Sequence, residues 1–159
     1  MKKYNLTPTD YEIESTVPTE SLLEEETVRY RNGVAFDYET GDFMRDGKNK
    51  ILDSSGIESW KSWCINCLQT QRYKHLAYSS DFGIDLDSVF AAESRAEAES
   101  ILTREIVEAI MADPYQRAKY VSELEFEWEQ PDAIVAHVII QGIDDVTIDV
   151  VAYITKGEA

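Results

Sequence analysis

The chain has few cations for its length and no long apolar run. Its 159 residues hold 15 Lys and Arg against 31 Asp and Glu, a formal net charge of −16. A field of that sign repels phosphate backbones and anionic lipids, so we expect neither nucleic acid nor a membrane as a partner. No apolar stretch approaches the roughly 20 residues that cross a bilayer, and the first residues lack the apolar part of a signal peptide. We therefore expect a protein made and kept in a reducing cytoplasm.

Cysteine is also scarce, and its two copies, Cys64 and Cys67, stand three positions apart. A Cys-x-x-Cys redox site needs a helix N-terminus to lower a thiol pKa, whereas this pair falls late in an expected helix. Zinc needs two further ligands at compact spacing, and the two histidines, His75 and His137, are far apart in sequence. We therefore expect no metal or other cofactor, and two thiols that pack as small apolar side chains.

Catalytic motifs are absent as well. The sequence has no glycine-rich phosphate loop, no Gly-x-Ser-x-Gly elbow and no His-Glu-x-x-His helix. Carboxylate pairs arise by chance among 31 acidic residues, so they do not indicate a glycosidase. His75 has no nucleophile in a recognisable context, and His137, inside an apolar strand, is expected to be a hydrogen-bonded core residue. The sequence predicts no enzyme.

Periodic patterns are present from residue 29 onward. We interpret residues 1–28, polar and acidic with weak periodicity, as an extended N-terminal arm, and residues 29–159 as one α+β domain. Alternating apolar positions predict a β-hairpin within 29–52, with Asp46-Gly47 at its turn because this pair supports positive φ angles.

Two main helices follow in the prediction. The first begins after one of the capping residues 53–55 and buries one face, formed by Ile57, Trp60, Cys64, Cys67 and Leu68. The second begins at a capping box, Ser94 with Glu97, and ends at Asp113-Pro114, because the residue before proline is pushed out of the α region. Its apolar stripe is formed by Ala98, Ile101, Leu102, Ile106, Ala109 and Ile110.

Three strands complete the predicted fold as a C-terminal antiparallel meander. The first alternates apolar residues with glutamates over 123–129, which indicates one buried and one acidic face. The second, 134–140, is nearly all apolar, which is typical of a central strand covered on both faces. The fold class is therefore α+β: an N-terminal β-hairpin, two main helices and a three-stranded meander.

Between the two helices lies a run unusual for an acidic chain. Arg72, Tyr73, Lys74, His75 and Tyr78 gather there, and Arg and Tyr often anchor protein–protein contacts. One reading is a loop whose aromatics pack on the domain and whose cations balance local carboxylates. The other, which we adopt as a hypothesis, places Arg72, Tyr73 and Tyr78 at an interface, with the arginine in a buried bidentate contact.

Five segments, at 41–43, 56–60, 68–73, 78–83 and 113–115, occur in the order seen in a family of small phage tail proteins. On these segments the sequence resembles, over residues 34–153, a baseplate wedge protein of contractile phage tails and tailocins. The type is that of Gram-positive hosts, within the lysozyme-like wedge family. The resemblance implies a structural subunit that surrounds the tail tube and templates the first ring of sheath. It also implies a baseplate location in a virion or tail-like particle assembled in the bacterial cytoplasm. Its partners would be sheath, tube and other wedge proteins in a six-fold assembly.

The resemblance also implies a contact after the second helix. The broader family has Glu-Pro-Arg there, which binds the helical core bundle of the wedge. This chain has Asp113, Pro114 and Arg117, so the arginine stands two positions late and Tyr115 takes its place. Asp113, Pro114 and Arg117 are therefore interface candidates.

The last predicted strand is a further candidate. Val146, Ile148 and Val150 can face the core, and with only 155–159 beyond the strand we expect no later element to cover its open side. An open edge can pair with a strand of another chain. A proline at 148 or 150 would block such pairing wherever that residue's N–H points outward.

Charge alone favours a function of another class. An acidic cytoplasmic regulator could use its charged face to block a basic, nucleic-acid-binding partner. That alternative does not explain the run around Arg72 or the apolar central strand. Tube, sheath and tape-measure genes beside the coding sequence would separate the two hypotheses.

Overall fold

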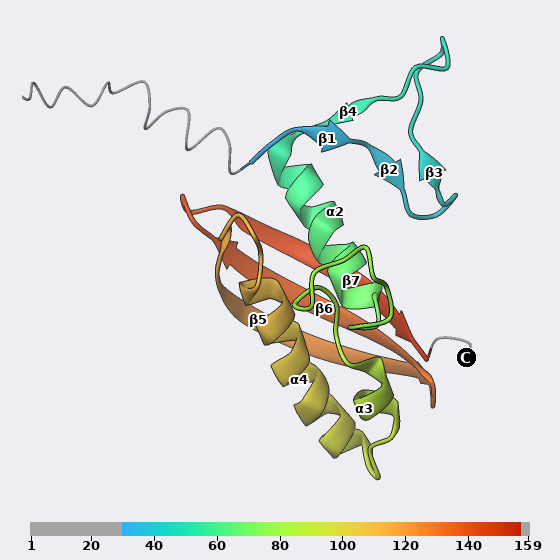
Figure 1. The fold of residues 1–159 in the computed structure, drawn as a ribbon, viewed down its shortest axis with the longest axis vertical. Helices are drawn as coiled ribbons and strands as arrows, with labels where there is room; N and C mark the ends of the chain where they lie inside the picture. The colour runs from blue at the N-terminus through green and yellow to red at the C-terminus, as the bar shows by residue number, and fades with distance from the viewer. Residues whose placement is uncertain (1–29, 157–159) are drawn as a thin grey trace, which may run out of the picture.

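The computed structural model describes residues 30–156, in which a three-stranded antiparallel sheet carries helices on one face (Figure 1). The elements are β1 (Gly33–Val34), β2 (Phe36–Asp37), β3 (Asp42–Phe43), β4 (Asp53–Ser54), α2 (Gly56–Gln69), α3 (Leu86–Phe90), α4 (Arg95–Met111), β5 (Ala118–Gln130), β6 (Ala133–Gly142) and β7 (Thr147–Thr155). The predicted fold class is confirmed. The predicted arm at 1–28 lies outside the described residues, so the division into arm and domain stays a prediction.

Both main helices begin at the predicted caps. Ser55 precedes α2, and its hydroxyl accepts the N–H of Glu58. Ser94 precedes α4 and accepts the N–H of Glu97, whose carboxylate in turn accepts the N–H of the residue before Ser94. The predicted face of α2 is buried except for Ile57, which is exposed. Ile57 lies in the first turn of α2, and this end of the helix lies beside the projecting N-terminal strands (Figure 1).

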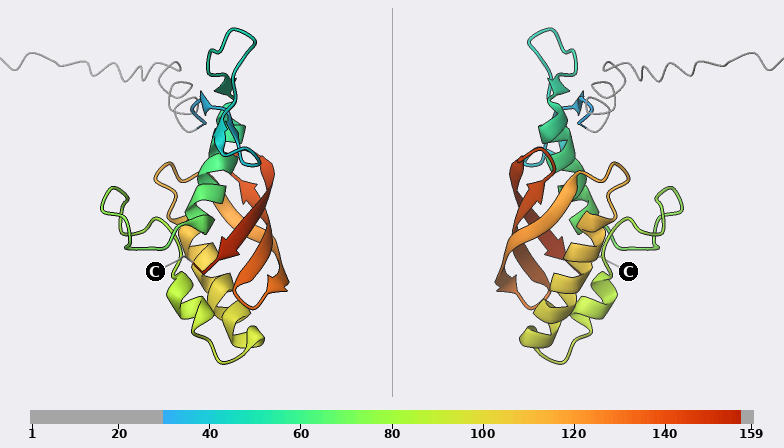
Figure 2. Two further views of the ribbon diagram at one scale, coloured as in Figure 1. Left: turned by 90° about the vertical axis from the view of Figure 1, so that its right-hand side faces the viewer. Right: turned by 90° about the vertical axis from the view of Figure 1, so that its left-hand side faces the viewer.

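The sheet order is β5-β6-β7, so β6 is the central strand, as predicted. Figure 2 shows the helices on one side of the sheet, with the other side open. The core lies between these two layers, and β6 contributes its even-numbered side chains to it: Ile134, Ala136, Val138 and Ile140.

The expectation that β6 is covered on both faces was wrong at His137, which is exposed rather than a core histidine, and at Ile139, which is half-buried. By strand alternation both share the face opposite the helices with Val135, which is only 5% exposed. An apolar run does not reveal how many layers cover a strand. β-branched residues favour a pleated strand on either face, whether or not a second layer lies over it.

The N-terminal hairpin is a narrow double strand that projects past the start of α2 (Figure 1), and we call residues 33–54 the ribbon. β1 pairs with β4, and β2 pairs with β3. Its outer turn differs from the prediction, because the left-handed residue is Asn49, with φ of 64°, and not Gly47. The Asp46 carboxylate instead accepts the N–H groups of Lys48 and Lys50. The turn is closed by a hydrogen bond from the Asp46 N–H to the Lys50 carbonyl, so it is longer than a two-residue turn. A longer turn does not need two consecutive residues with positive φ angles.

The ribbon is fixed at its base. The Tyr38 hydroxyl donates to the carbonyl of Ser62 in α2 at 3.2 Å, and the hydroxyls of Ser54 and Ser59 lie 2.6 Å apart. Phe36 packs edge-on against Phe43 within the ribbon, with ring centroids 5.5 Å apart. The ribbon is therefore an ordered projection on the end of α2.

Candidate assembly interfaces

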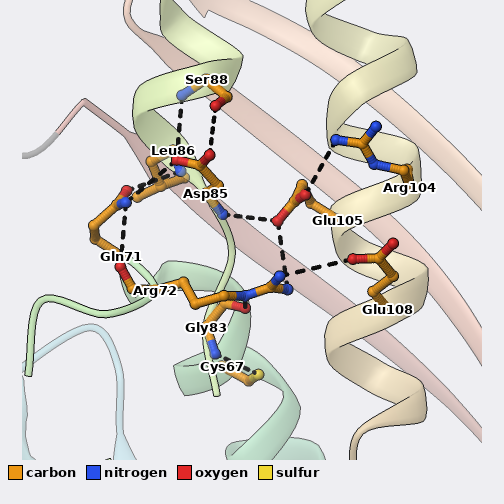
Figure 3. Close-up of polar contacts among 10 residues, drawn as sticks. All are labelled: Cys67, Gln71, Arg72, Gly83, Asp85, Leu86, Ser88, Arg104, Glu105 and Glu108. Atoms are coloured by element: carbon orange, nitrogen blue, oxygen red, sulfur yellow. Dashed lines mark hydrogen bonds and ion pairs between the residues drawn. The ribbon is translucent and has the colours of Figure 1, made fainter. Parts of the chain in front are cut away.

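Arg72 is paired within its own chain. Its guanidinium leaves the end of α2 and points to α4 (Figure 3), where Nη2 lies 3.4 Å from Glu105 Oε2 and Nη1 lies 3.7 Å from Glu108 Oε2. Its Nε donates to the carbonyl of Gly83 at 3.0 Å. The side chain is only 13% exposed. The structure thus pairs Arg72 with two glutamates of its own chain, and a bidentate contact of Arg72 with a partner stays a prediction.

A polar network extends this pairing to α3. Glu105 is buried and also accepts the N–H of Asp85 at 3.0 Å. Gln71 accepts the N–H of Leu86 at 2.8 Å (Figure 3). The hydrogen bond from the Ser88 hydroxyl holds the pKa of Asp85 below its ordinary value, with burial acting in the opposite direction. The residues after α2 are therefore tied to both following helices.

The segment 72–83, which we call the Arg72 loop, projects from the helix side of the molecule (Figure 2). Gly83 closes its base with φ of 95°, in a space where an added Cβ would lie 2.6 Å from the carbonyl of Thr70. Tyr73 is 75% exposed and Leu76 is fully exposed, whereas Tyr78 packs partly on Phe82 at 4.5 Å between centroids. The loop thus combines an internally neutralised arginine with an exposed tip. Sequence reasoning missed Leu76, since a single leucine gives no periodic signal.

Asp113 and Arg117 form a buried ion pair after α4. Arg117 Nε donates to Asp113 Oδ2 at 2.7 Å and Nη2 to Oδ1 at 2.8 Å, with side chains 6% and 1% exposed. The guanidinium carbon lies 5.1–6.0 Å from the ring centroids of Trp60, Trp63 and Tyr115. Both charges are therefore occupied inside the chain. The exposed part of this corner consists of Pro114, Tyr115 and Gln116.

The hydrogen bonds of the last hairpin reveal which way each amide of β7 points. The Gly142 N–H donates to the Val146 carbonyl at 2.6 Å, and at the far end the Lys156 N–H donates to the Asp132 carbonyl at 3.1 Å. The register between these bonds is unbroken. Because bonded and non-bonded pairs alternate in an antiparallel ladder, the even-numbered residues of β7 bond to β6. The groups that point outward belong to Thr147, Asp149, Val151, Tyr153 and Thr155.

The condition attached to the predicted proline test is therefore not met. Ile148 and Val150 are buried and direct their N–H groups to β6, so a proline at either position breaks the sheet itself. Val146 precedes β7 and is half-buried against the core. Proline at 149, 151 or 153 removes an outward donor instead.

The two cysteines pack in the core as predicted. Burial raises the pKa of both Cys64 and Cys67, and Cys67 Sγ accepts the N–H of Gly83 at 3.3 Å. Among residues 30–156, no group of three His, Cys, Asp or Glu side chains is placed to hold a metal ion. Within the same range, no helix has the length and apolarity to cross a membrane.

A comparison with protein families finds one match that bears on this arrangement. A family model described as contractile injection system sheath initiator matches residues 33–145, and the chain therefore belongs to that family. A search of curated proteins found no match. The resemblance drawn from the ordered sequence segments is thus confirmed at the level of the baseplate sheath initiator. Membership gives the chain a structural role in a phage tail-like particle, in association with other components of a contractile injection system.

Proposed function

We propose that this sheath initiator is a baseplate wedge subunit that surrounds the tail tube and templates the first ring of sheath by strand addition at β7. The observation that carries the proposal is the outer edge of β7. No strand of the described chain pairs with it, and its register with β6 is regular along the whole strand. Strand addition provides main-chain hydrogen bonds, with alternate side chains giving specificity.

The other edge of the sheet is less suited to accept a strand. β5 has three register irregularities against β6 and carries several glutamates. Bulges and charges are common means of protecting an edge from pairing. Only Asp149 is charged among the outward-pointing residues of β7. β7 is thus the edge of this sheet that is best suited to accept a strand.

The corner after α4 supplies a second contact in this proposal, with the helical core bundle of the wedge. Because Asp113 and Arg117 are buried together, they shape the corner, and Pro114 and Tyr115 present it to the partner. Tyr73 and Tyr78 of the Arg72 loop contact another wedge protein. Sheath and tube subunits complete a six-fold particle assembled in the bacterial cytoplasm, in which this subunit has no enzymatic role.

The test is proline substitution at the outward amide of Val151. Val151→Pro removes a donor that the isolated fold does not use, so the protein should stay folded by circular dichroism while particles lose their sheath. Val151→Thr keeps the N–H group and the branched shape, and should support sheath assembly. Normally sheathed particles from Val151→Pro would overturn strand templating at β7.

A further inference from the structure

Two surfaces of the described chain have no partner and are complementary to each other. The first is the ribbon, which exposes more than a third of each of five large apolar side chains: Val34, Tyr38, Phe43, Met44 and Leu52. Its outer turn, residues 45–50, carries Arg45, Lys48 and Lys50 against the single carboxylate of Asp46, a net charge of +2 in a chain of −16. The rest of the ribbon combines these apolar side chains with four carboxylates, those of Asp37, Glu39, Asp42 and Asp53, so the cations of the ribbon are confined to its outer turn.

The second surface is the face of the sheet that the helices leave open, which we call the open sheet face. The strand register aligns Glu125 of β5, His137 of β6 and Val151 of β7 across it. The neighbouring rows, equally aligned, are Glu127, Val135 and Tyr153 on one side, and Glu123, Ile139 and Asp149 on the other. A groove of about 320 Å³ runs over this face between β5 and β7. Four carboxylates line it, those of Glu123, Glu125, Glu127 and Asp149, together with His137, Ile139 and Phe126, so the groove is acidic.

We propose that the ribbon of one subunit docks on the open sheet face of a second copy of this chain. The cationic outer turn would meet the acidic groove along the β5 glutamates, and the exposed apolar side chains of the ribbon would contact apolar side chains of the face such as Tyr153. The net charge of −16 opposes association at long range, but at physiological ionic strength charges more than about 8 Å apart are largely screened, so the local pairing decides.

The placement of the two surfaces indicates a head-to-tail contact. The ribbon projects past the end of the sheet, and the open sheet face lies on the side opposite the helices (Figures 1 and 2). In that position the ribbon does not cover its own sheet. A contact between two different patches leaves each subunit with one ribbon and one face to offer, which closes into a ring when the rotation allows. This inference goes beyond strand templating and does not depend on it.

Disulfide trapping on the purified full chain tests the contact without sheath. Cys64 and Cys67 are fully buried, so a disulfide between introduced, exposed cysteines can be detected without interference from the native thiols. Met44→Cys mixed with a mass-tagged His137→Cys should form the mixed disulfide at least about tenfold faster than the matched control Met111→Cys mixed with the same partner. Met44 and Met111 are almost equally exposed, at 47% and 46%, and Met111 lies on α4 away from the ribbon. Equal rates would overturn the proposal.

Charge reversal provides the second arm of the experiment. Lys48→Glu with Lys50→Glu should reduce trapping to the control rate, and Glu125→Lys with Glu127→Lys on the partner should restore it. Lys119→Glu with Lys156→Glu changes the net charge equally and should have no effect, as both side chains are exposed outside the ribbon. Failure of the restoring pair, with all variants folded, contradicts docking on this face. In whole particles, trapping of Met44→Cys on a different protein would contradict the choice of a second copy.

Discussion

The two edge strands of the sheet, β5 and β7, differ in what holds them. β5 is held near both ends: Arg117, directly before the strand, pairs with Asp113 in the turn after α4, and Trp128 Nε1 donates to Glu99 Oε1 of α4 at 2.8 Å. β7 packs its buried side chains under α2, and its outward amides have no strand beside them in the described chain. In this fold, side-chain contacts hold one edge strand of the sheet near its ends, and the other edge strand keeps a regular row of unpaired backbone groups. That asymmetry supports the proposal that β7 is the edge that accepts a strand.

The largest effect should come from the fastening of β5. Arg117→Ala leaves the Asp113 carboxylate buried without its cation, which typically costs about 3–5 kcal/mol. Chemical denaturation of the purified chain measures this loss. As a control, Arg31→Ala removes another arginine that stacks on Tyr115 but pairs with no buried carboxylate of residues 30–156, and it should cost far less. A loss below about 1 kcal/mol for Arg117→Ala would mean that this pair does not hold β5.

Proline substitutions along β7 should distinguish the amides that bond to β6 from the amides that point outward. Val150→Pro removes a bond to β6 and should destabilise the chain by about 3 kcal/mol or more, the usual cost of proline in a hydrogen-bonded interior. Val151→Pro, one position later, should cost much less because its N–H points outward. Thermal unfolding of the two variants, with Val150→Thr and Val151→Thr as references, measures the difference. Equal losses would contradict the assigned amide directions.

Arg72→Ala should lower the free energy of unfolding by an intermediate amount, and it changes neither of the edge strands β5 and β7. It removes one of the two cations that lie against the buried Glu105 and leaves Arg104, whose Nη2 is 3.4 Å from Glu105 Oε1. We expect a loss of about 1–3 kcal/mol, the usual range when a buried polar group loses a partner. The chain should still fold, which keeps the variant usable for assembly assays. Glu108→Ala, which removes the more exposed partner, should cost less. Matching losses for the two variants would show that the Glu105 contact is not the principal one.

The smallest effect should come from the far end of β5. Trp128→Phe removes the hydrogen bond to Glu99 but keeps an aromatic ring beside Arg95, so the loss should be about 1 kcal/mol. Amide exchange should rise at the end of β5 and stay unchanged in β7. If exchange rose equally in both strands, the two edges would not be held independently.

Local signals in the sequence predicted much of this fold. The capping residues Ser55 and Ser94 set both helix starts, because they act on backbone groups within three positions. The apolar stripe of α4 and the alternation in β5 predicted their buried faces for the same reason. Features with local causes were therefore within reach of the sequence.

Features that depend on the tertiary arrangement could not be predicted from the sequence. The carboxylates that pair with Arg72 lie more than 30 positions along the chain, on another helix, and no spacing rule links them. The direction of the β7 amides depends on a turn in which Asp144 and Asp145 both have positive φ, and a turn one residue longer would reverse it. His137 was misplaced because the number of layers over a strand is a property of the whole fold.

A high-resolution structure of the assembled particle would test the central claim most directly. If β7 templates the sheath, a strand of a sheath subunit should lie antiparallel or parallel to its outer edge. That strand should hydrogen-bond to the amides of Asp149, Val151 and Tyr153. An outer edge of β7 that faces solvent, or that is covered by side chains without a paired strand, would contradict the account.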